Sequence, residues 1–86
     1  MENKIDNSIY FLKDYGKVNL TLKEVMDKKK VTRNKLSLIT GSTNNVIDRY
    51  YHNNISRLDL DVIARICFVL KCDISDIIKY EKNTNK

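Results

Sequence analysis

Residues that break regular structure are nearly absent from this chain. It contains no proline, and its two glycines are Gly16 and Gly41. Because glycine and proline mark most turns in chains of many short strands, their scarcity predicts an all-α fold with short connections. At 86 residues, we expect one domain with a small core, marginally stable alone and helped by dimerisation.

Short polar residues stand where helices are expected to begin. Thr21 and Glu24 have the spacing of a capping box, in which each side chain binds the backbone N–H of the other residue. Thr32, Asp59 and Asp73 fit as caps of three further helices, because an apolar residue just before each can pack against one in the following turn. These patterns fix four helix starts.

A fifth start lies in the stretch TGSTNNVIDRYY, residues 40–51. Gly41 suits the end of the preceding helix, where a left-handed residue is needed. Ser42 or Thr43 then caps a helix whose apolar face includes Ile47 and Tyr50. The sequence therefore predicts five helices in all.

The two ends of the chain are less regular. Residues 1–13 fit a helix through Ile5, Ile9 and Leu12, whereas IYFL and KVNL around KDYG fit a hairpin. We favour an extended YGKVNL segment, which would add a short β-strand to the N-terminal arm. The last helix is expected to include Ile78 and to give way to a polar tail after Tyr80. The predicted division is an extension (1–17), a helical domain (18–80) and a disordered tail (81–86).

The positive charge is concentrated in the middle of the chain. Residues 28–58 hold seven lysines and arginines against Asp48 alone, a net of +6, while the other residues carry −1 and the whole chain +5. Such a block is the electrostatic footprint expected for a polyanionic partner. A solvated surface that favours solubility is the alternative.

Two short helices joined by a glycine turn make a helix-turn-helix motif, whose second helix can enter the major groove of DNA. Thr43, Asn44 and Asn45 would lie at the N-terminus of that helix. Asparagine can pair with adenine through two hydrogen bonds, and threonine can bind a base edge or touch a thymine methyl. Ile47 and Tyr50 would face inward and join the two helices.

The segment RNKLSLITGSTNNVIDRYY resembles the helix-turn-helix of the Cro and phage-repressor (XRE-type) regulators. Leu36, Ser37 and Ile47 stand at the apolar, small and aliphatic positions of that motif. LDLDVIARICFVLKCDISDII resembles the last two helices of a small-regulator branch of the family. Ser42 departs from the pattern, because an aliphatic residue usually follows the glycine.

The resemblance implies a five-helix, lambda-repressor-like domain that binds double-stranded DNA as a homodimer on a near-palindromic operator and acts as a repressor. By position, five residues would face the bases: Thr43, Asn44, Asn45, Asp48 and Arg49. Seven others would contact phosphates: Lys30, Thr32, Arg33, Asn34, Asn53, Asn54 and Arg57. Asp48 could instead reduce non-specific attraction, and Arg49 could pair with Asp48. For Tyr51 and His52 the sequence leaves both a DNA-backbone contact and a purely structural role open.

Other classes of function have little support in the sequence. There is no Ser-His-Asp set, phosphate-binding glycine loop or metal-ligand cluster, so no enzyme activity, cofactor or metal is expected. Cys67 and Cys72 are expected to pack as small apolar residues. With no apolar run near 20 residues and no signal-peptide pattern, we expect a cytoplasmic protein with no membrane contact and no small-molecule domain. The rival interpretation is a protein-interaction adaptor or antirepressor built on the same fold.

Overall fold

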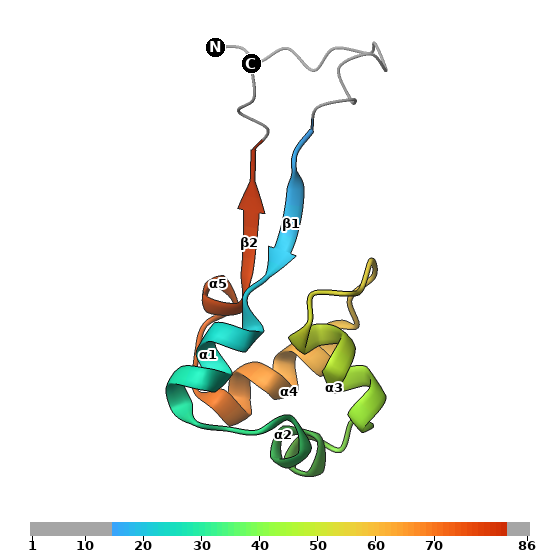
Figure 1. Ribbon diagram of the computed structural model, residues 1–86, viewed down its shortest axis with the longest axis vertical. Helices are drawn as coiled ribbons and strands as arrows, with labels where there is room; N and C mark the ends of the chain where they lie inside the picture. The colour runs from blue at the N-terminus through green and yellow to red at the C-terminus, as the bar shows by residue number, and fades with distance from the viewer. Residues whose placement is uncertain (1–14, 83–86) are drawn as a thin grey trace.

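The computed structural model describes residues 15–82. Within this range the elements are β1 (Lys17–Leu20), α1 (Leu22–Lys29), α2 (Arg33–Thr40), α3 (Asn44–Tyr51), α4 (Leu60–Leu70), α5 (Ile74–Ile77) and β2 (Ile78–Glu81). The helices form one body, and the two strands project from it side by side (Figure 1). The predicted helical fold with a strand in the N-terminal arm is thus confirmed. Our expectations for residues 1–14 and for 83–86 lie outside the described residues.

The core lies where the inner faces of the helices meet. Its buried members are spaced three or four residues apart along α1 and α4, as expected for amphipathic helices: Leu20, Leu22, Met26, Leu36, Ile47, Tyr50, Ile63, Ile66, Leu70 and Ile77. The Tyr50 hydroxyl accepts a hydrogen bond from the backbone N–H of Asp59 at 2.9 Å. This bond satisfies a buried polar group and ties α3 to the start of α4.

Three predicted caps are confirmed by hydrogen bonds from backbone N–H groups: Thr32 accepts from Lys35 at 3.1 Å, Thr43 from Val46 at 3.2 Å and Asp59 from Asp61 at 2.9 Å. Thr43, rather than Ser42, therefore caps α3. The predicted start of α5 is also confirmed, because the backbone N–H of Asp73 donates to Asp76 Oδ2 at 2.9 Å.

The capping box predicted at Thr21 is wrong. The Thr21 side chain makes no cap hydrogen bond and instead donates to the backbone carbonyl of Asp76 at 2.8 Å. The backbone N–H of Thr21 also donates to Ile77 O at 2.8 Å. Thr21 therefore continues the pairing of the two ends of the chain, and its backbone, at φ −112° and ψ 30°, lacks the extended conformation of a cap.

The partner of β1 is the other end of the domain. β1 pairs antiparallel with β2, with Lys17 opposite Glu81 and Leu20 opposite Ile78. Two predictions need correction here: α5 ends at Ile77 instead of including Ile78, and Glu81 lies in a strand rather than in the tail. The backbone groups of this segment pair with β1 instead of continuing the helical hydrogen bonds of α5. The strands thus extend one residue beyond each end of the predicted domain.

Candidate nucleic-acid interface

The N-terminal half of α3 carries short polar side chains on its outer surface. Thr43, Asn44 and Asn45 are exposed, and Arg49 follows one turn later, also exposed. On the inner side Ile47 is fully buried and Tyr50 is 2% exposed. Because the buried pair anchors α3 to the body, the polar residues are held outward on a fixed helix. This is the arrangement that the sequence predicted.

The turn between α2 and α3 is fixed by hydrogen bonds as well as by glycine. Gly41 has φ 80°, and its N–H donates to Ser37 O at 3.0 Å. The buried Ser37 hydroxyl donates to Ser42 O at 2.6 Å, and Ser42 N donates to Thr40 Oγ1 at 3.3 Å. The hydroxyls of Ser37 and Thr40 thus hold the backbone of Ser42, at the position where the resemblance led us to expect an aliphatic residue.

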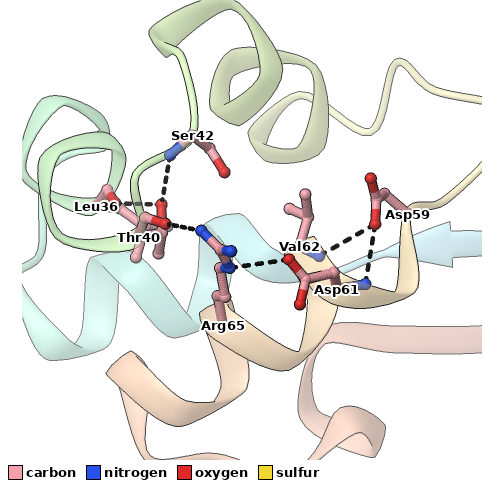
Figure 2. Close-up of polar contacts among 7 residues, drawn as sticks. All are labelled: Leu36, Thr40, Ser42, Asp59, Asp61, Val62 and Arg65. Carbon is pink, nitrogen blue, oxygen red and sulfur yellow. Dashed lines mark hydrogen bonds and ion pairs between the residues drawn. The ribbon is translucent and has the colours of Figure 1, made fainter.

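Arg65 of α4 joins the body to this turn (Figure 2). Its Nη1 donates to the carbonyl of Thr40 at 2.8 Å, while its Nε lies 2.9 Å from Asp61 Oδ2. The Thr40 hydroxyl in turn donates to Leu36 O at 2.7 Å. Sequence reasoning missed Arg65 because its partner lies 25 residues away. The available signal was the helical spacing of Asp61 and Arg65, which aligns the guanidinium.

A groove runs between the end of α1, the start of α2 and the outer face of α3. Residues predicted to contact phosphate line it together with two predicted to contact bases: Lys30, Thr32, Arg33 and Asn34 with Asn44 and Asp48. Lys30 has φ 57°, so its left-handed backbone ends α1 and leads the chain towards this groove. The fold therefore places members of both predicted sets on one surface.

Comparison with known proteins identifies the family of this domain. A family model for the Cro/C1-type helix-turn-helix DNA-binding domain matches residues 21–83. The chain belongs to this family. The fold is similar to the crystal structure of a candidate DNA-binding protein from Bacteroides fragilis, at 25% identity and a TM-score of 0.66, covering 73% of this chain and all of that one. A search of the curated proteins gave no match.

In this Cro/C1-type domain the first residue of α2 is bound to α3. Arg33 Nη1 lies 3.1 Å from Asp48 Oδ1 and 3.1 Å from His52 Nε2. The same guanidinium lies over the ring of Tyr51, 4.7 Å from its centroid, a cation–π contact. Asp48 thus pairs with Arg33 rather than with Arg49, and Tyr51 and His52 both contact the Arg33 guanidinium.

The loop after α3 holds the remaining predicted phosphate contacts. Asn53 has φ 59°, and its side chain is engaged at both ends: Oδ1 accepts from Leu20 N at 2.8 Å and Nδ2 donates to Asn19 Oδ1 at 3.0 Å. Its role in this structure is to hold β1 against the loop. Asn54 and Arg57 are exposed nearby.

Residues 15–82 contain no group of three metal-ligating side chains that could hold an ion and no helix long and apolar enough to span a membrane. Cys67 and Cys72 are free, half-buried and packed against the core. Burial, with a smaller effect of the neighbouring Cys67, raises the pKa of Cys72 to about 11. A thiol with a raised pKa is a poor nucleophile at neutral pH.

Proposed function

We propose that this domain is a sequence-specific transcriptional repressor that reads a palindromic operator as a homodimer. The observation that carries the proposal is the exposed Thr43–Asn45 segment at the start of α3, fixed from behind by the buried Ile47 and Tyr50. Membership of a DNA-binding family supports it, as does the similarity to the candidate DNA-binding protein of Bacteroides fragilis.

In the proposed complex α3 lies in the major groove. Asn44 and Asn45 reach base edges, where an asparagine amide can pair with adenine at two points. Thr43 already accepts the Val46 N–H, so it offers its methyl group and its hydroxyl proton. Arg49, one turn further along α3, reads guanine or binds a phosphate.

Phosphate contacts are proposed for the groove and for the loop after α3. Lys30, Thr32, Arg33 and Asn34 lie on one side of α3, and Asn54 and Arg57 follow it. These contacts would fix the register of α3 without reading sequence. A two-fold dimer would place its two α3 helices on half-sites about 34 Å apart. In this proposal the bound domain represses transcription by occupying the operator.

The test is selection of bound duplexes from a random pool at physiological salt, followed by Asn44→Ala on the selected site. We expect an inverted repeat, and a loss of about 1–3 kcal/mol of binding free energy on that site with little change on random DNA. Asn54→Ala is the matched control, because loss of a phosphate contact weakens all sequences alike.

A pool with no enriched site would refute the proposed base reading and favour the adaptor function. Equal losses on selected and random DNA for Asn44→Ala would remove that residue from the set of base contacts.

A further inference from the structure

The strands β1 and β2 form a two-stranded sheet whose peptide groups alternate in direction. Thr21 N donates to Ile77 O, and Thr21 is opposite Ile77 in the register that pairs Val18 with Tyr80. Since hydrogen-bonded and non-hydrogen-bonded pairs alternate along an antiparallel ladder, Val18 and Tyr80 form a non-hydrogen-bonded pair. The N–H and C=O groups of Tyr80 therefore point to the outer edge of β2.

The two outer edges of this sheet differ. On β1 the outward N–H of Leu20 is taken by Asn53 Oδ1 at 2.8 Å, so the loop after α3 covers that edge at Leu20, though not at Val18. On β2 the outward groups of Tyr80 have no partner among the described residues 15–82. A sheet of two strands is only marginally stable alone, and an uncovered edge is a template for another strand. Figure 1 shows that β2 projects away from the helices.

The sequence of β2 is complementary to itself in the antiparallel direction. With Tyr80 on a two-fold axis, its N–H and C=O would exchange hydrogen bonds with those of the partner's Tyr80. Lys79 would then lie opposite the partner's Glu81, in a non-hydrogen-bonded pair, where side chains approach most closely. The Nζ of Lys79 donates to Ser75 O, which leaves two of its three donors for a carboxylate.

The face of the sheet opposite these charges is apolar. Side chains alternate between faces along a strand, so Tyr80 and Val18 share one face with Ile78 and Leu20. Leu20 is buried against the body, but Val18 is 56% and Tyr80 61% exposed. A second copy would therefore add aromatic cover to this exposed apolar surface as well as hydrogen bonds.

We propose that β2 is the dimer contact of this protein, and that it pairs with β2 of a second copy to make a four-stranded antiparallel sheet in the order β1-β2-β2-β1. The proposal deepens the proposed function, because it names the surface that joins the two DNA-reading domains. In this arrangement the helical bodies lie at opposite ends of the shared sheet. The exposed side chains Leu60 and Phe68 of α4 then lie outside the dimer contact.

The charges of β2 allow a test by exchange. In a dimer of Lys79→Glu, the new glutamate at position 79 of each copy faces Glu81 of the other copy. In a dimer of Glu81→Lys, the new lysine at position 81 of each copy faces Lys79 of the other copy. Each variant alone should dimerise about 10- to 30-fold more weakly than the wild type, because two opposite-charge pairs become like-charge pairs. An equimolar mixture should recover wild-type affinity, since each strand of one variant complements the other.

Sedimentation velocity of the full chain over a concentration series measures these dimerisation constants. Lys28→Glu, the same charge change on the exposed end of α1, is the matched control and should leave dimerisation unchanged. The idea is overturned by a wild type that is monomeric at every concentration, by single variants that dimerise normally, or by a mixture that does not recover. Loss of dimer in Phe68→Glu but not in Lys79→Glu would assign the contact to α4.

This outcome is separable from that of the proposed function. Binding of Lys79→Glu to a duplex with one half-site reports on α3 alone. A variant that is monomeric and still binds the half-site supports both proposals. Failure of every form to select a DNA sequence contradicts only the proposed base reading.

Discussion

Replacing Asp48 by asparagine is expected to strengthen binding to DNA of any sequence. In the free protein Asp48 neutralises Arg33 across 3.1 Å, at the surface where phosphates are expected. The two side chains are 47% and 43% exposed, so the pair contributes at most about 1 kcal/mol to the free energy of unfolding. Asparagine has nearly the same shape and keeps an oxygen that can accept from Arg33.

The size of the effect follows from counterion release. One further uncompensated positive charge at the interface steepens the dependence of log K on log salt by up to about 0.9. A change of 0.9 in that slope corresponds to an about eightfold larger gain in affinity for each tenfold fall in salt concentration. The assay is fluorescence anisotropy between about 50 and 200 mM salt. The duplex has a random sequence, so that a base-specific contact made by the new asparagine does not contribute to the measured slope.

Asp61→Asn is the matched control. It removes the same charge and also breaks an exposed ion pair, that of Asp61 with Arg65 at 2.9 Å, but on α4 instead of α3. Its slope should remain that of the wild type. Adding Arg33→Ala to Asp48→Asn should return the slope to the wild-type value. Equal slopes for the two asparagine variants, or no effect of Arg33→Ala in the Asp48→Asn background, would refute the reasoning.

Two further predictions concern stability and thiol chemistry. Leu36→Ala should lower the free energy of unfolding in urea by about 2–5 kcal/mol, because Leu36 is fully buried; Leu38→Ala on the same helix, 75% exposed, should change it by less than about 0.5 kcal/mol, and similar losses would contradict the packing of α2. Burial raises the pKa of Cys72 to about 11 from 9.0, so the folded chain favours the protonated thiol. The resulting contribution to the free energy of unfolding is complete below about pH 9 and is lost as the pH rises towards 11. Peptide-level alkylation at pH 8 should therefore label Cys72 more slowly in the folded than in the urea-unfolded chain, and equal rates would count against this explanation.

Much of the site was predictable because its determinants are local. A cap such as Thr43 and a glycine such as Gly41 act within four residues along the chain. The burial of Ile47 and Tyr50 follows from helical periodicity. These features sufficed to place α2, the turn and α3, and hence to expose Asn44 and Asn45. The DNA contacts themselves stay predictions.

The partners of several polar groups could not be predicted, because they lie far away in the sequence. Arg33 and Asp48 are 15 residues apart, and Arg65 reaches Thr40 across 25. Asn53 was predicted to contact phosphate from its position after α3, yet it binds the edge of β1, 33 residues earlier. Each of these side chains has several chemically equivalent partners in the sequence, and the packing of the helices selects one.

The sequence alone determined where the helices of this protein begin, most of their caps and the inner face of each, because these depend on interactions within one or two turns. The tertiary structure decided the rest. The Thr21 hydroxyl donates to the carbonyl of Asp76, which lies beside it only in the folded chain. Ile78–Glu81 form a strand because β1 lies beside them. A strand gains its hydrogen bonds only from a partner, and here that partner lies about 60 residues away in the chain.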